Sequence, residues 1–401
     1  MDQNDTVLFK ARALLITEAE LDISRKHQQA EVMARLDREH NLARMKLANG
    51  ESGALKHPLA VRVTHVFCVA AFRELIAEAS LTSPLATMFL VGFDGTKLAY
   101  RVFMPRQEPT AVLVLPSHIY LRFNRACAEL TSKFSIMVAL VDLRGYGQSG
   151  GKRATSGERK DLWRDLRTVV KHFKLNNPML PIFLGGFFRN GGAVLNYSTW
   201  AHREPVDGYV FLAPDQGKSD CFNPDGFKAF HKDVSFKINW GSMAVGYLTG
   251  GYLNGQSPAY EFRYPESMAR SAPVGNIGIN DVLATRPVDA RRQFAAIDVP
   301  FGFWIGSEDE FFFPEKAIEA PQLAKVPGCE IKIIEGARHY TLMDEVIEPL
   351  GKWLTEQAET CKKETPPGLH TCPPLLTPVS LLCPIRLFGG NAAGSAAEYR
   401  V

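Results

Sequence analysis

The stretch Gly185-Gly-Phe-Phe-Arg-Asn-Gly-Gly192 separates two segments of different pattern and decides the fold of this 401-residue chain. Before it, residues 181–185 form a short apolar run that is typical of a buried strand. After it, residues 193–200 have the pattern of a helix. Glycine pairs at both ends of the stretch allow the strand and the helix to approach closely. The sequence therefore predicts a strand, a sharp turn and a helix in immediate succession.

This context is that of the Gly-x-Ser-x-Gly turn, which presents a serine on a sharp bend between a strand and a helix. Here Phe188 stands at the serine position and Asn190 at the position of the last glycine. A phenylalanine ring cannot attack a carbonyl carbon as an activated hydroxyl does, and neither can Arg189 or Asn190. The motif is a nucleophile elbow without its nucleophile.

The composition is that of an ordinary globular protein, with 46% hydrophobic and 22% charged residues and a formal net charge of +3. Basic residues are spread along the chain, so the charge favours neither nucleic acid nor an acidic membrane as a partner. The start of the chain lacks the pattern of a secretory signal. The most apolar stretch, residues 60–72, is too short to span a bilayer. We expect no transmembrane segment and a small-molecule ligand.

Seven cysteines are scattered along the chain, with no Cys-x-x-Cys pair and no clustered histidines. Their odd number and irregular spacing argue against a disulfide framework and against a zinc site. The sequence therefore predicts no metal and no other cofactor. It favours the reducing cytoplasm as the location of the protein.

Three parts of the chain differ in pattern. Residues 1–87 are rich in charged and helix-forming residues and predict a helical N-terminal arm. Residues 361–401 are rich in proline and glycine and predict an irregular or disordered tail. Residues 88–360 form the main domain between them. Its candidate strands are 88–93, 97–103, 111–116, 136–141, 181–185, 208–212, 300–305 and 330–334, and its candidate helices are 157–175, 191–203, 314–325 and 344–360.

The early candidate strands come in pairs, whereas the later ones are separated by helices. This order predicts an α/β fold whose antiparallel start leads into a mostly parallel, eight-stranded sheet with helices on both faces. Between about residues 216 and 295 the strand pattern lapses and aromatic residues become frequent. We expect an insertion that covers the crevice at the sheet edge as a cap, because its apolar surface must be buried. Its aromatic residues could form the core of the cap or the wall of an apolar pocket.

Three more loops follow candidate strands at the edge where the carboxyl ends of parallel strands converge. Asp142-Leu-Arg-Gly-Tyr-Gly-Gln-Ser149 follows the fourth strand, Gly306-Ser-Glu-Asp309 the seventh and Gly336-Ala-Arg-His339 the last. With the elbow, and in this order, they make residues 88–360 resemble the α/β-hydrolase superfamily. The likeness is greatest to its monoacylglycerol lipase, lysophospholipase and serine aminopeptidase-like group.

The resemblance implies roles for individual residues. His339 would be the general base, Asp309 would hold its imidazole in the right tautomer, and the nucleophile would come from position 188. Backbone N–H groups of Arg189 and Ile119 would form the oxyanion hole. His118 and Trp240 are expected to contact the substrate, a small apolar ester or amide. Ile119 stands where the group usually has glycine.

Asp142 and Arg144 are interpreted as structural residues under the site, and Ser149 lies on the wrong loop to replace the nucleophile.

Three interpretations stay open at this point. The chain could be a non-catalytic pseudo-hydrolase that acts as a small-molecule binding or interaction protein. It could be an ester, lipid or peptide hydrolase in which water activated by His339 replaces the serine. It could also be a decayed copy, since Phe188 and Asn190 both depart from the usual residues. The sequence leaves the oligomeric state open.

Overall fold

The computed structural model describes residues 87–364, except residues 118–119, 218–219, 231–234 and 264–273. Of the predicted N-terminal arm, residues 1–87, only residue 87 is among the described residues. The predicted tail, residues 361–401, lies outside them after residue 364.

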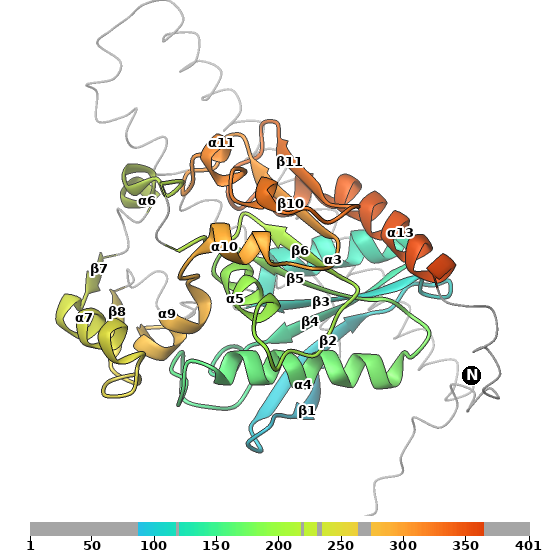
Figure 1. Ribbon diagram of the computed structural model, residues 1–401. Coiled ribbons are helices and arrows are strands. Elements are labelled where there is room, and N and C mark those ends of the chain that lie inside the picture. The colour runs from blue at the N-terminus through green and yellow to red at the C-terminus, as the bar shows by residue number, and fades with distance from the viewer. Residues whose placement is uncertain (1–86, 118–119, 218–219, 231–234, 264–273, 365–401) are drawn as a thin grey trace, which may run out of the picture. The chain divides into compact units, whose positions relative to one another are not determined.

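A central sheet of eight strands has the order β1-β2-β4-β3-β5-β6-β10-β11 (Figure 1). β1 and β4 each pair antiparallel with β2, and the other neighbours pair in parallel. The predicted α/β fold with a mostly parallel, eight-stranded sheet and an antiparallel start is confirmed. The strands are β1 (Met88–Val91), β2 (Lys97–Phe103), β3 (Ala111–Ser117), β4 (Ile136–Asp142), β5 (Ile182–Phe187), β6 (Gly208–Leu212), β10 (Phe301–Gly306) and β11 (Glu330–Ile334).

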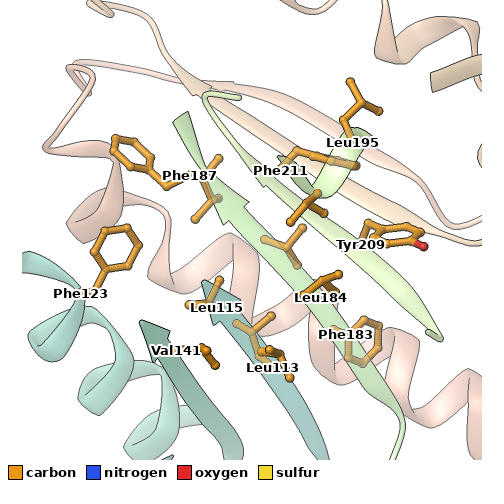
Figure 2. Packing of buried hydrophobic residues seen from close by; sticks show 14 of the residues in the cluster. Leu113, Leu115, Phe123, Val141, Phe183, Leu184, Phe187, Leu195, Tyr209 and Phe211 are labelled. Atoms are coloured by element: carbon orange, nitrogen blue, oxygen red, sulfur yellow. The ribbon is translucent and has the colours of Figure 1, made fainter. Parts of the chain in front are cut away.

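The central strands read as continuous apolar runs because the sheet is covered on both faces. Every residue of β3, β4, β5 and β6 is buried. Figure 2 shows Leu113 and Leu115 of β3 in the cluster of buried side chains that also holds Leu184 of β5. At the carboxyl end of β5, Phe187 contacts Phe123, with ring centroids 5.8 Å apart. The core therefore runs directly up to the elbow.

Helices cover both faces of this sheet. They are α3 (Tyr120–Phe134), α4 (Asp161–Asn176), α5 (Phe188–Ser198), α11 (Pro314–Ala317), α12 (Leu342–Glu345) and α13 (Ile347–Glu364), with a short 3₁₀ turn at Pro321–Leu323. α3 was not among the candidate helices. Its buried residues Phe123, Ala126, Cys127 and Leu130 have the spacing of one helix face, which was the signal that could have revealed it.

The described residues of the insertion after β6 form four helices and three strands: α6 (Pro224–Phe230), β7 (Ser235–Ile238), α7 (Trp240–Thr249), β8 (Pro258–Arg263), β9 (Asn276–Gly278), α9 (Ile279–Thr285) and α10 (Ala290–Ala295). The interpretation that the strand pattern lapses here is wrong in one respect, because β7, β8 and β9 pair as an antiparallel sheet. These strands have only three to six residues. Such short strands show too little alternation to be recognised from sequence.

Candidate active site

Two neighbouring parallel strands bring Asp309 and His339 together. Asp309 lies three residues after the end of β10, and His339 follows β11, its parallel neighbour. The distance from His339 Nδ1 to Asp309 Oδ2 is 2.8 Å, and both side chains are fully buried. The sequence placed these two side chains within hydrogen-bonding reach, and the structure has this contact.

The loop after β10 is built around the Asp309 carboxylate. Its Oδ1 accepts hydrogen bonds from the backbone N–H groups of Phe311 at 2.8 Å and Phe312 at 2.9 Å. The backbone N–H of His339 donates to Glu310 Oε2 at 3.0 Å. Because Nδ1 faces the carboxylate, the imidazole presents Nε2 to the site. Nε2 is buried and has no hydrogen-bond partner among the described residues.

The elbow runs from β5 into α5, and Phe188 lies at its tip. The backbone φ of Phe188 is +49°, in the left-handed region that a bulky residue rarely adopts. The glycines around it permit the close approach of strand and helix. A Cβ atom at Gly186 would lie 2.5 Å from Asn190 O, and one at Gly191 would lie 2.7 Å from Pro214 Cβ. The backbone thus forms the predicted sharp strand-turn-helix, with a phenylalanine at its strained position.

The Phe188 ring packs edge-to-face against His339, with ring centroids 4.8 Å apart and an interplanar angle of 85°. Four more rings lie around the imidazole, at centroid distances between 4.4 and 5.9 Å. They belong to Phe187, Phe311, Phe312 and Tyr340. Sequence analysis did not identify this aromatic enclosure. Its signal was the run Phe311-Phe-Phe313 after the acid turn and Tyr340 beside the histidine.

Asn190 fits the elbow, although glycine is usual at this position. Its side chain is buried, and Nδ2 donates to Pro116 O at the end of β3 over 2.9 Å. Within residues 185–192, Phe188 alone has a positive φ. The asparagine is therefore accommodated in the elbow, where its side chain donates a hydrogen bond to the neighbouring strand.

The other predicted site residues are placed less fully. Arg189 lies in the first turn of α5, and its Nη2 donates to Thr285 Oγ1 in α9 over 3.1 Å. Ile119 and His118 lie outside the described residues, so the oxyanion hole of Arg189 and Ile119 and the substrate contact of His118 both stay predictions. Trp240 begins α7 and is 71% exposed. Among the ring contacts of the described residues none joins Trp240 to His339 or Phe188, and its role in substrate binding also stays a prediction.

Side chains of the loop after β4 form hydrogen bonds and ion pairs with neighbouring elements. Ser149 Oγ donates to Asp142 O at 2.6 Å and accepts from the backbone N–H of Ala99 at 2.8 Å. Arg144 is buried and pairs with Asp165 through Nε at 2.6 Å and with Asp94 through Nη1 at 2.8 Å. Burial raises the pKa of Asp142 to about 6.

Parts of the insertion border the loops that hold this site. Phe227 of α6 contacts Phe311, with ring centroids 5.5 Å apart, and Phe222 forms a β-bridge with Phe312. On the other side α9 packs against α5, and Asn196 Nδ2 donates to Ala284 O at 2.9 Å. Both contacts favour the predicted cap, whose extent over residues 216–295 stays a prediction.

The sheet order, the strained elbow and the Asp309–His339 pair together are those of the α/β-hydrolase fold. Residues 117–346, more than half of the chain, match the family described as serine aminopeptidase, S33. The chain belongs to this family.

Among individual proteins, the chain is similar to monoglyceride lipases. It is 24% identical to human monoglyceride lipase over 290 residues, which is 69% of this chain and 93% of the human protein. It is 31% identical to a monoacylglycerol lipase of Mycolicibacterium smegmatis over 109 residues, which span 26% of this chain and 39% of that enzyme. The crystal structure of a soluble variant of the Saccharomyces cerevisiae monoglyceride lipase superposes with a TM-score of 0.55 at 16% identity. That match covers 69% of this chain and 96% of the yeast chain, and it supports the fold.

Proposed function

We propose that this protein, of serine ester, lipid or peptide hydrolase lineage, has lost serine catalysis at position 188 and acts as a non-catalytic protein that binds a small apolar ester or amide. The observation that carries the proposal is the packing of the Phe188 ring on His339, with centroids 4.8 Å apart. Attack on a carbonyl needs an oxygen within about 3 Å of both the base and the carbonyl carbon. Phe188 supplies no such oxygen, and its ring fills space beside the base.

The magnitude of this loss is large. Removal of the nucleophile from a catalytic triad lowers turnover by a factor on the order of a million. The remaining catalysis comes from the oxyanion hole and from substrate binding. We therefore expect Asp309 and His339 to serve chiefly as a buried hydrogen-bonded pair that holds the loops of the site.

The ligand class follows from the rings and from the relatives. The enclosure around His339 is aromatic, and such surfaces favour apolar ligand groups. The relatives named above are monoglyceride lipases, so we propose an acylglycerol-like ester as the first ligand to try.

One observation favours a second candidate, hydrolysis by a water molecule that His339 activates. His339 Nε2 is buried without a partner among the described residues, so it could accept a hydrogen bond from water. The five aromatic rings around the imidazole disfavour this alternative, because a water molecule beside them has few polar partners.

The test is hydrolysis of a monoacylglycerol and of a p-nitrophenyl butyrate by four forms of the chain: unmodified, His339→Ala, Phe188→Ser and Phe188→Ser with His339→Ala. The unmodified chain and His339→Ala should show the same background rate. Phe188→Ser should recover part of the activity, and the double variant should lose it again. A rate of the unmodified chain that disappears in His339→Ala would establish the water mechanism and overturn the proposal.

A further inference from the structure

The insertion contacts the elbow at its base. The chain passes through Asp215 directly before the insertion, and the backbone N–H of Asp215 donates to Phe188 O over 2.9 Å. Farther along the chain, α9 lies beside α5 (Figure 1). Gly192 of α5 approaches Thr285 O so closely that a Cβ atom on this glycine would collide with it. Two segments far apart in the sequence therefore meet at the start of α5.

Arg189 links the elbow to α9 through a hydrogen bond whose direction is fixed. Thr285 is buried, and its Oγ1 donates to Asp281 O over 2.7 Å. A hydroxyl group has one hydrogen to donate, so the same Oγ1 accepts the hydrogen bond from Arg189 Nη2, which lies 3.1 Å away. Because this donor carries a full charge, the bond is roughly twice as strong as a bond between neutral groups.

The charge of Arg189 also acts on two carboxyl groups at the base of the insertion. One belongs to Asp281 of α9, which is fully buried and accepts a hydrogen bond from the backbone N–H of Ser156 at 2.8 Å. The other belongs to Asp215. Burial raises the pKa of both carboxyl groups, and the positive charge of Arg189 opposes this rise in each, together with Arg286 in the case of Asp215. The guanidinium of Arg189 is thus a positive charge that both segments share.

The helices described in the insertion are short, with six to ten residues each. No helix in the described part of the chain is long and apolar enough to cross a membrane. Helices of six to ten residues are not stable alone and depend on tertiary packing. The contacts at the base of the insertion therefore decide where α9 lies.

Side chains of the main domain donate hydrogen bonds to the last turn of α9. Asn196 Nδ2 and Trp163 Nε1 both donate to Ala284 O, over 2.9 and 3.0 Å. Asn196 lies about two turns along α5, and Trp163 lies on α4. Arg189 differs from these donors because it lies in the elbow, directly after Phe188. Its bond to α9 joins the insertion to the turn that carries the nucleophile position.

We propose that Arg189 anchors the insertion on the elbow, so that α9 and the first turn of α5 open as one unit in local unfolding. Arg189 is a positioning residue in this account, and it acts by holding Thr285 of α9 against α5. The hydrolase resemblance implied a role for the backbone N–H of Arg189 alone, and the anchor gives a role to its side chain. The anchor needs neither a nucleophile nor a ligand, so it goes beyond the proposed function.

Hydrogen–deuterium exchange of the full chain, read by mass spectrometry, tests this anchor. Arg189→Met keeps a long side chain but removes the charge and the donor. Backbone amides of residues 279–285 and 188–192 should then exchange about tenfold faster than in the unmodified chain, by the same factor in both segments. The exchange of α13, whose Trp353 packs on Phe183 of β5, should not change.

Two further variants make the result specific. Thr285→Val removes the acceptor of the same bond, so adding Arg189→Met to it should accelerate exchange much less than Arg189→Met does alone. The matched control is Arg203→Met, which removes a guanidinium that pairs with the exposed Asp298 at 3.2 Å. The control should change the exchange of residues 279–285 by less than about twofold.

Unchanged exchange of residues 279–285 in Arg189→Met would overturn the proposal. An equal increase in α13 would show a loss of overall stability and would overturn it too. Faster exchange of α9 without faster exchange of residues 188–192 would show that insertion and elbow open separately, which contradicts a single unit. Should Arg189→Met not fold, Arg189→Lys, which keeps the charge but not the planar donor group, replaces it and should give a smaller increase in the same two segments. None of these outcomes depends on whether the chain hydrolyses esters.

Discussion

The two halves of the candidate site differ in what they have kept. In the half formed by the loops after β10 and β11, both the backbone and the side chains are those that the hydrolase resemblance implies, with Asp309 and His339 at 2.8 Å. In the elbow, the backbone geometry is present but the side chain at its tip is Phe188, at φ +49°. The first half supports its own geometry by hydrogen bonds. The second has a strained turn with a phenylalanine, which is not a nucleophile, at its tip.

This difference teaches that the two halves of the candidate site depend on different physical supports. The Asp309 carboxylate also holds two backbone N–H groups of its own loop, so its loss would disturb packing. The elbow is held by glycines at its close approaches and by the sheet and α5 on either side. The residue at its tip can therefore change without loss of the fold.

The largest effect is expected from breaking the first half. Asp309→Ala leaves two backbone N–H groups and the His339 imidazole without their buried acceptor. The free energy of unfolding in urea should fall by about 3 kcal/mol. The exposed Asp298, paired with Arg203 at 3.2 Å, is the control, and Asp298→Ala should cost less than about 1 kcal/mol. Equal effects would show that Asp309 does not support its loop.

A smaller effect should come from the elbow side. Asn190→Ala removes the buried hydrogen bond from Nδ2 to Pro116 O. We expect a loss of about 1 to 2 kcal/mol in urea unfolding. Asn176→Ala removes an exposed hydrogen bond to His172 O and should change little. If Asn190→Ala leaves the free energy of unfolding unchanged, the hydrogen bond does not compensate for the absent glycine.

The strain at the tip of the elbow can be measured by a pair of variants. Phe188→Ala and Phe188→Gly both remove the ring, but glycine adopts φ +49° without steric cost. Phe188→Gly should therefore be more stable than Phe188→Ala by about 1 kcal/mol in the same unfolding assay. If alanine is as stable as glycine, the elbow relaxes once the ring is gone, and the turn is not held by its surroundings.

The smallest effect concerns Asp142, at the end of the strand beside β3. Burial raises its pKa to about 6, above that of an unfolded chain. Its contribution to stability is thus fully present below about pH 4 and is lost as the pH rises through 6. In Asp142→Asn the free energy of unfolding should fall less between pH 4 and 7 than in the unmodified chain. An unchanged slope would assign the pH dependence to other groups, such as Asp165, whose pKa burial also raises to about 6.

Most of the fold and the positions of Asp309 and His339 could be predicted from the sequence, because these depend on local patterns. The central strands β3, β4, β5 and β6 are short apolar runs, and Asp309 and His339 lie three and five residues after the ends of β10 and β11. The small sheet of β7, β8 and β9 could not be predicted, since strands of three to six residues show too little alternation. The hydrogen bond from Asn190 to Pro116 could not be predicted either, because its partners are 74 residues apart in the sequence and only the folded sheet brings them together.

The central claim, that Phe188 has ended serine chemistry in this site, is tested most directly by intact-mass spectrometry after incubation with a fluorophosphonate probe. The unmodified chain should gain no probe mass, whereas Phe188→Ser should gain one phosphonyl group, and this gain should be lost when His339→Ala is added. Labelling of the unmodified chain that disappears in His339→Ala would show that another nucleophile acts in this site and would contradict the account.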